Sequence, residues 1–200
     1  HLMSVAKSAL LLTTKLGVDM AKIYYDVPPE KSRVVKDGDS VDLGGKTLKF
    51  LEAPWLHWPE TMFTFCVEDR ILFPCDFFGT HMAFDRIYDD EVGDMLLPEA
   101  KRYYADIMMP FPTFVKRGLD KAKALDVGII APSHGPIYRN PKRIMRAYEE
   151  WAVGPLKPKA VVIYVSMWGS TEALEKAITE ALSAEGIETI PHNLLVSDVT

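Results

Sequence analysis

The sequence predicts an α/β protein made of two successive parts. Strand-like and helix-like segments alternate over residues 1–152, and a stretch with two prolines, Val153-Gly154-Pro155-Leu156-Lys157-Pro158, then interrupts the pattern. After this stretch a strand, a helix and a strand follow one another over residues 159–196, which is the opening unit of a doubly wound parallel sheet. We therefore expect a first domain over residues 1–152, a linker over 153–158 and the start of a second domain over 159–200.

The first part begins with a predicted helix and continues into a predicted hairpin. Residues 4–16 carry apolar side chains at three- and four-residue spacing and are followed by Gly17, which predicts a helix that ends there. The Gly44-Gly45 pair lies between two strand-like runs, residues 40–43 and 47–51. Glycine supplies the positive φ angles of tight hairpin turns, so this pair predicts the turn.

Further strands, a long loop and several helices are predicted after the hairpin. The runs 62–67 and 70–75 are apolar enough to be strands covered on both faces, and residues 77–97 have no regular period and predict a long loop. The remaining predicted elements are helices over residues 98–108, 112–125, 141–151 and 171–183 and strands over 127–131, 159–165 and 187–196.

Composition excludes some classes of function. The chain is 48% hydrophobic and 26% charged, as in an ordinary globular protein. Its net charge of -5 argues against nucleic acid as a main partner, because phosphate binding needs clustered Lys and Arg. No apolar run reaches the roughly 20 residues that cross a bilayer, and we predict no signal peptide. Cys66 and Cys75 are expected to be buried free thiols of a cytoplasmic protein, with a single disulfide as the alternative.

Three residues at predicted strand ends are candidate metal ligands. His57, Asp76 and His134 each stand beside proline or small residues in a turn after an apolar run. Two imidazoles and a carboxylate suit a first-row metal ion such as zinc, iron or manganese. Ordinary histidines in turns and an aspartate that caps a loop are the alternative. His81, five residues after Asp76, either lies beside such a site or is simply exposed.

A second candidate site follows the linker, between a predicted strand and a predicted helix. The loop Ser166-Met167-Trp168-Gly169-Ser170-Thr171 offers hydroxyls and backbone N–H groups at a helix N-terminus, which favour a bound phosphate. No GK[ST] or GxGxxG motif is present, which disfavours nucleoside triphosphates and dinucleotides and leaves a flavin mononucleotide phosphate as a good candidate. A plain helix cap by Ser170 or Thr171 is the alternative.

Read together, these stretches resemble the flavodiiron proteins, oxygen- and nitric-oxide-reducing enzymes that join a metallo-β-lactamase-like di-iron domain to a flavodoxin domain. The resemblance covers nearly the whole chain and rests on four motifs in the family's order: His57-Trp58-Pro59-Glu60-Thr61-Met62, Phe73-Pro74-Cys75-Asp76-Phe77-Phe78-Gly79-Thr80-His81, Ala131-Pro132-Ser133-His134-Gly135-Pro136 and Ser166-Met167-Trp168-Gly169-Ser170-Thr171-Glu172.

The resemblance implies a fold and two cofactors. Residues 1–152 would be the latter part of a metallo-β-lactamase-like αββα sandwich, and residues 159–200 the start of a flavodoxin-like doubly wound sheet. The catalytic centre would be a pair of irons. His57 and His134 would each ligate one iron and Asp76 would bridge the two. The flavin mononucleotide (FMN) phosphate would be held by Ser166, Met167, Gly169, Ser170 and Thr171.

The chain departs from the family's pattern at both ends. The family's first ligand motif, His-x-Glu-x-Asp-His, would precede residues 1–50, and nothing like it occurs in this sequence. The later loops that hold the isoalloxazine ring would follow Thr200. The resemblance thus implies an internal fragment that contains part of each site and is expected to be inactive alone.

The implied activity is reduction of O₂ to water, of NO to N₂O, or of both, with electrons passed from FMN to the irons. The residues do not separate O₂ from NO, and the electrons would come from a donor protein or a reduced cofactor. A head-to-tail homodimer is expected, because the proline-containing linker is short and semi-rigid. A metal-dependent hydrolase of the same sandwich fold and a scaffold without activity are the alternatives. The phosphate-type loop after the linker favours the redox enzyme over the hydrolase.

Overall fold

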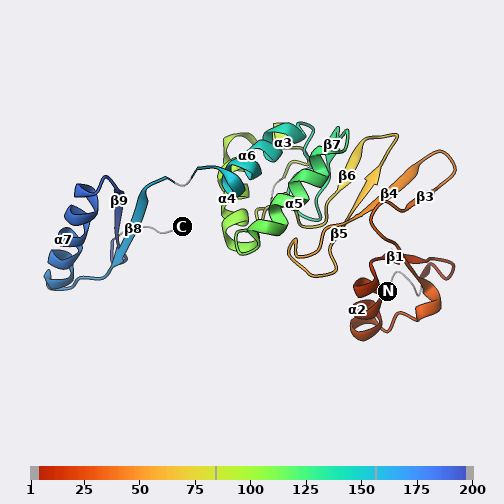
Figure 1. Ribbon diagram of the computed structural model, residues 1–200, viewed down its shortest axis with the longest axis horizontal. Coiled ribbons are helices and arrows are strands. Elements are labelled where there is room, and N and C mark those ends of the chain that lie inside the picture. Colours follow the sequence, from red (N-terminus) through yellow and green to blue (C-terminus); the bar gives the residue numbers. More distant parts are fainter. Residues whose placement is uncertain (1–4, 84, 156, 197–200) are drawn as a thin grey trace. The chain divides into compact units, whose positions relative to one another are not determined.

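The computed structural model describes residues 5–83, 85–155 and 157–196. The chain divides into two compact units, residues 1–154 and 155–200, and each is described by itself (Figure 1). Among the described residues, none of the helices has the length and apolar character needed to cross a bilayer.

The first unit is built on a five-stranded mixed sheet in the order β3-β4-β5-β6-β7. Its strands are β3 (Ser40–Asp42), β4 (Thr47–Glu52), β5 (Met62–Cys66), β6 (Ile71–Phe73) and β7 (Ile129–Ile130). The pairs β3–β4, β4–β5 and β5–β6 are antiparallel, whereas β6–β7 is parallel. The predicted hairpin is confirmed, since Gly44 and Gly45 have φ angles of 81° and 120°. The predicted strand pair at 62–75 is confirmed as well.

Three helices supply most of the remaining core of this unit (Figure 1). They are α4 (Leu96–Tyr103), which continues into a π-helical turn, η3 (Tyr104–Met108), α5 (Pro112–Lys123) and α6 (Pro141–Val153). Proline opens α5 and α6, where its missing N–H is not needed. Fully buried side chains from the sheet and the helices form one cluster that includes Phe63, Leu72, Ile130, Val115 and Ile144. The predicted helices over 98–108, 112–125 and 141–151 are therefore confirmed.

The predicted helix over residues 4–16 is wrong. Ser4 lies outside the described residues, Leu11–Thr13 forms the strand β1, and the helix is α2 (Lys15–Tyr25). Thr14 begins this helix, because its hydroxyl accepts a hydrogen bond from the N–H of Gly17 at 3.1 Å. Gly17 therefore lies in the first turn and does not end a helix. A Cβ on Gly17 would lie 2.2 Å from the hydroxyl of Thr13, so the glycine is required by this close approach.

A small parallel pair accompanies α2. The strand β1 pairs with β2 (Ser32–Val34), and the 3₁₀ turn η1 (Pro29–Lys31) precedes β2. The predicted loop over residues 77–97 is wrong from Asp89 onward, because this part contains α3 (Asp89–Val92), the 3₁₀ turn η2 (Gly93–Met95) and the start of α4. Acidic residues fill the first turn of α3, a position where the helix dipole stabilises negative charge.

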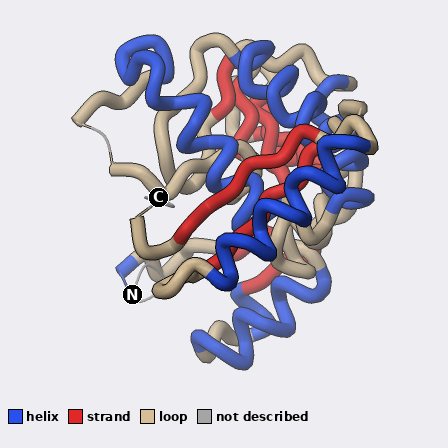
Figure 2. The backbone as a smooth tube through the Cα atoms, turned by 90° about the vertical axis from the view of Figure 1, so that its left-hand side faces the viewer, coloured by secondary structure: helices blue, strands red, loops and turns tan. Residues whose placement is uncertain are grey.

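The second unit contains one β-α-β element. Strands β8 (Lys159–Tyr164) and β9 (Glu188–Asn193) pair in parallel in full register, and α7 (Ser170–Ala184) connects them and lies alongside the pair (Figure 1 and Figure 2). This arrangement confirms the predicted strand, helix and strand. With the mixed sheet and helices of the first unit, it confirms the predicted α/β fold class.

Both cysteines are free thiols, so the alternative of a disulfide is excluded for this pair. Cys66 is buried as expected, but Cys75 is exposed, because it lies in the turn after β6 and not within the strand.

Candidate metal centre

The three candidate ligands follow strands that run in the same direction. His57 lies in the turn after β4, Asp76 follows β6 and His134 follows β7. The strands β4 and β6 are both antiparallel to β5, and β6 is parallel to β7. All three therefore end at one edge of the sheet, and their loops meet there.

The carboxylate of Asp76 lies between the two imidazoles. Its Oδ2 is 3.4 Å from Nε2 of His57, and its Oδ1 is 3.6 Å from Nε2 of His134. The structure thus brings together all three residues that the sequence selected as metal ligands. One oxygen of the carboxylate faces each ring. A carboxylate placed in this way could be shared by two ligand sets that each contain one histidine.

The loop of Asp76 is held in a constrained shape. Cys75 and Phe78, on either side of Asp76, have φ angles of 56° and 72°, which non-glycine residues seldom adopt and which concentrate at functional sites. The N–H of Gly79 donates to the carbonyl of Asp76 at 3.0 Å, and the N–H of Ser133 donates to the carbonyl of Cys75 at 2.8 Å. The second bond ties the Asp76 loop to the His134 loop.

The orientation of His134 is fixed by its other ring nitrogen. Its Nδ1 lies 2.8 Å from the carbonyl oxygen of Thr80. A carbonyl oxygen only accepts hydrogen bonds, so Nδ1 carries a proton, and in the neutral ring it is Nε2, on the side of Asp76, that has the free lone pair. A histidine whose second nitrogen donates to a carbonyl is the usual form of a metal-binding imidazole.

Glycines allow this close packing. A Cβ on Gly79 would lie 2.7 Å from Cε1 of His134, and a Cβ on Gly135 would lie 2.9 Å from the backbone nitrogen of Thr80. Gly135 also has a φ of 87°, which a side chain would strain. Both positions therefore require glycine for the ring of His134 to lie against the Asp76 loop.

Two aromatic rings border the side of His134. Its ring centroid is 5.1 Å from that of Tyr103 and 5.5 Å from that of His81, and these two rings meet edge to face at 4.7 Å. The hydroxyl of Tyr103 lies 3.5 Å from Nε2 of His134. Burial, with the nearby charge of Asp76 adding to it, raises the pKa of Tyr103 well above its ordinary value, so this hydroxyl stays protonated at neutral pH. His81 is exposed, and it also lies beside the site.

A cavity of about 480 Å³ adjoins these rings. It is lined by His81, Met82, Glu99, Arg102, Tyr103 and Asp106. Sequence reasoning missed Tyr103, because nothing in the pattern of α4 distinguishes a tyrosine that packs in the core from one that faces a site. Thr80 and Gly135 were missed as well, since their roles depend on how two distant loops meet.

In the part of the chain that the structure describes, no group of three or more His, Cys, Asp and Glu side chains is placed to hold a metal ion. The shared carboxylate instead gives each histidine its own oxygen. Imidazole and carboxylate are suitable ligands for iron. Each ion would take two ligands from these three residues and would need others.

The loop between β8 and α7 has an open helix N-terminus. Gly169 precedes α7 with a φ of 85°, and no side chain caps the helix. Ser170 and Thr171 are the first two residues of α7, so the alternative that one of them caps the helix is wrong. The hydroxyl of Ser166 accepts the N–H of Gly169 at 3.0 Å and shapes the turn. Met167 is exposed beside it, and the loop leaves hydroxyls and N–H groups for an anion.

Comparison with known proteins agrees with this architecture. The sequence model of a protein family described as "ODP family beta lactamase" matches residues 1–135. The chain belongs to this family. It is 42% identical over 201 residues to a nitric oxide reductase of Moorella thermoacetica, an alignment that covers 98% of the chain and 50% of the relative. The flavodiiron resemblance is also confirmed by solved structures.

Two such structures match nearly the whole chain. The flavodiiron protein from Giardia intestinalis has a TM-score of 0.83 at 31% identity, covering 96% of this chain and 48% of that one. The rubredoxin oxygen:oxidoreductase from Desulfovibrio gigas has a TM-score of 0.87 at 25% identity, with 98% and 50% covered. The chain therefore spans about half the length of the flavodiiron relatives that it matches.

Proposed function

We propose that the full-length protein is a flavodiiron oxidoreductase that reduces O₂ to water, NO to N₂O, or both. The observation that carries this proposal is the position of the Asp76 carboxylate between Nε2 of His57 and Nε2 of His134. Relatives named as a nitric oxide reductase and as a rubredoxin oxygen:oxidoreductase support an oxidoreductase. Neither name decides between the two substrates for this chain.

The residues have distinct roles in this proposal. His57 and His134 would each hold one iron, and Asp76 would be shared between the two irons. The irons would supply electrons and adjacent binding positions for a diatomic substrate. Thr80 keeps the proton of His134 on Nδ1. The hydroxyl of Tyr103 keeps its own proton, because burial raises its pKa, and it can donate a hydrogen bond beside Nε2 of His134.

The second unit would hold FMN. Ser166, Met167, Gly169, Ser170 and Thr171 would surround its phosphate at the N-terminus of α7, where the helix dipole and the free N–H groups favour an anion. Such a loop is not needed by a hydrolase, and this favours the redox function over the hydrolase alternative.

The direct test uses the full-length protein. We expect about two irons and one FMN per chain, and consumption of O₂ or NO when the flavin is reduced chemically. Asp76→Asn keeps the shape of the side chain but removes its charge, so it should lower iron content and activity together. Asp126→Asn, at an exposed residue away from the site, is the matched control. A protein that lacks flavin, or that hydrolyses esters or amides with its metals, would refute the proposal.

We further propose that the enzyme works as a head-to-tail homodimer. Only residues 154–158 separate the end of α6 from the start of β8, and five residues span at most about 18 Å. Two prolines stiffen this connection. A short, stiff linker disfavours folding of the flavin unit onto its own metal site, whereas two-fold pairing sets each flavin against the site of the other chain.

Mixed dimers test this arrangement. One full-length variant would carry Asp76→Asn, and the other would carry Ser170→Ala and Thr171→Ala. Recovery of O₂ or NO reduction in the mixture supports transfer between chains. Mixed dimers that form but stay as inactive as their parents refute it.

A further inference from the structure

Two segments distant in the sequence are hydrogen-bonded side by side next to the metal centre. One follows Asp76 (residues 78–83 and 87–91), and the other begins at His134 (residues 134–139). We call the bonds between them the loop ladder. Its rungs are Tyr138 Oη to Phe78 O at 2.9 Å, His134 Nδ1 to Thr80 O at 2.8 Å, Ile137 N to Ile87 O at 2.8 Å, Asp89 N to Ile137 O at 3.0 Å and Arg139 N to Asp89 Oδ1 at 2.7 Å.

Apart from the start of α3 at residues 89–91, the described residues of the loop ladder contain little regular secondary structure. The isolated bridge Tyr88–Ile137 joins its two segments, and the bridge Ile130–Tyr138 joins the second segment to β7. Loops of this kind open more readily than paired strands. The ring of His134 depends on one of the rungs, so separation of the two segments would release its Nδ1–H and let the imidazole rotate.

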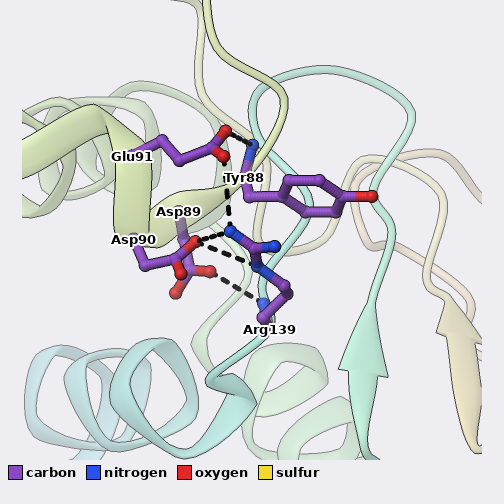
Figure 3. A network of polar contacts seen from close by, with 5 residues as sticks. All are labelled: Tyr88, Asp89, Asp90, Glu91 and Arg139. Atoms are coloured by element: carbon purple, nitrogen blue, oxygen red, sulfur yellow. Dashed lines mark hydrogen bonds and ion pairs between the residues drawn. The ribbon is translucent and has the colours of Figure 1, made fainter.

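The end of the ladder away from His134 is closed by Arg139 (Figure 3). Its Nη2 and Nε donate to Asp90 Oδ1 at 2.6 Å and 3.0 Å, and Nη2 also reaches Glu91 Oε1 at 3.4 Å. The guanidinium lies 3.8 Å from the centroid of the Tyr88 ring. The other oxygen of Glu91 accepts the backbone N–H of Tyr88 at 3.4 Å.

This cluster differs from an isolated surface ion pair. A single exposed pair contributes little, because water and salt screen it. Here the same guanidinium is stacked on an aromatic ring and bonded to two carboxylates, which restricts it to one orientation. Its backbone N–H is also bonded to Asp89, whose side chain is only 2% exposed. The cluster therefore fixes both segments at once.

We propose that Arg139, with Asp90 and Glu91, positions His134 by holding the loop ladder closed. Arg139 touches neither a metal ligand nor the cavity beside Tyr103, so it acts through the rungs and is a positioning residue. We call the contacts of Arg139 with Asp90 and Glu91 the clamp. With the clamp in place, Nδ1 of His134 stays on Thr80 and Nε2 stays turned toward Asp76. The effect on the side chain of His134 stands by itself, and the effect on metal binding rests on the proposed function.

The test uses the full-length protein in its metal-free state, labelled with ¹⁵N-histidine. The Nδ1–H proton of His134 should give a slowly exchanging signal, assigned by its loss in His134→Gln. Arg139→Met removes the clamp but keeps a long side chain. Arg139→Lys keeps the charge without the paired donors or the stacked plane. Arg70→Met is the matched control, because Arg70 also bonds an exposed carboxylate, Asp126, at 2.7 Å but at the start of β6, the opposite end from Asp76.

We expect exchange of the His134 proton to be about ten-fold faster in Arg139→Met, intermediate in Arg139→Lys and unchanged in Arg70→Met. Equal exchange in Arg139→Met and the wild type would overturn the proposal. So would equal acceleration in Arg139→Met and Arg70→Met, because that result would indicate a general loss of stability. If Arg139→Met does not fold, Arg139→Lys and Asp90→Asn carry the same comparison.

A second measurement separates this inference from the proposed function. Iron(II) would be titrated into each variant in competition with a chelator. We expect its dissociation constant to rise about ten-fold in Arg139→Met and not in Arg70→Met, the low end of the range for residues that orient metal ligands. A wild type that binds no iron would refute the proposed function. The proton-exchange result would then still decide whether Arg139 positions His134. Iron bound equally well by all variants, with faster proton exchange in Arg139→Met, would overturn the link to metal binding.

Discussion

Gly79→Ala is expected to damage the proposed metal centre while the fold survives. The added Cβ would lie 2.7 Å from Cε1 and 2.9 Å from Nδ1 of His134, whereas ordinary contacts begin near 3.4 Å. The imidazole must therefore move by about 0.7 Å, or the Asp76 loop must move by a similar amount. Gly79 does not have a positive φ, so the substitution adds a collision and no backbone strain.

The size of the effect follows from this displacement. Metal–ligand distances tolerate deviations of only about 0.2 Å. Even if the surrounding loops absorb part of the 0.7 Å displacement, the remainder would move Nε2 by more than this tolerance. It also stretches the bond from Nδ1 to Thr80, which measures 2.8 Å. Loss of such an orienting bond costs about 10- to 100-fold in metal affinity, equivalent to about 1.4–2.7 kcal/mol.

The assay is a competitive iron(II) titration of the full-length protein, with urea unfolding of the same samples. Gly128→Ala is the control, because a Cβ there meets Arg70 at an ordinary 3.4 Å. We expect weaker iron binding in Gly79→Ala alone. Wild-type affinity in Gly79→Ala would show that the ring of His134 is not confined by this loop, and the argument would fail.

Three other substitutions or conditions test the fold and the second site. Tyr138→Phe leaves the carbonyl of Phe78 buried without its donor, so the free energy of unfolding in urea should fall by about 1–3 kcal/mol, while the exposed Tyr25→Phe should have no effect. Burial raises the pKa of Tyr138, so above about pH 10 the unfolded chain releases a proton that the folded chain keeps. Above about pH 10 the free energy of unfolding should therefore fall by roughly 1.4 kcal/mol per pH unit through this group. If the free energy of unfolding falls as steeply with pH in Tyr138→Phe as in the wild type, this reasoning is contradicted. Replacing Ser170 and Thr171 together by alanine should weaken FMN retention by about 1.5–3 kcal/mol for each hydroxyl bonded to the phosphate, and unchanged flavin affinity in equilibrium dialysis would remove the loop from the site.

Local signals in the sequence were sufficient for most of the fold. The Gly44-Gly45 turn acts within a few residues, and the strand-helix-strand order over residues 159–196 is likewise visible in short stretches of the chain. The helix expected over residues 4–16 failed, because apolar spacing there fits both a helix and a strand. The choice depends on Thr14, whose hydroxyl begins the helix one residue after β1 ends.

The candidate ligands could be selected from the sequence, but their surroundings could not. Histidine and aspartate beside proline or glycine after an apolar run are visible in the chain itself. Tyr103, Thr80 and Arg139 are not, because their contacts with His134 or with the loop ladder join segments between 31 and 54 residues apart. Such contacts exist only after the sheet has brought the loops together.

The order of the strands explains why the carboxylate of Asp76 lies between the two imidazoles. Neighbouring strands lie about 4.8 Å apart, so the end of β7 is one strand from the end of β6, and the end of β4 is two strands away on the other side. Asp76 therefore lies between the two histidines along the sheet edge, and its two oxygens face opposite neighbours. The longer gap on the side of β4 is crossed by the 53–61 loop, in which Leu56, beside His57, is 1% exposed and is packed over Gly118 of α5. A larger residue at Gly118 would push on Leu56, since a Cβ there would lie 2.5 Å from its Cδ1. The packing of Leu56 against Gly118 therefore anchors the loop and keeps His57 near Asp76, which the order of the strands alone would not do.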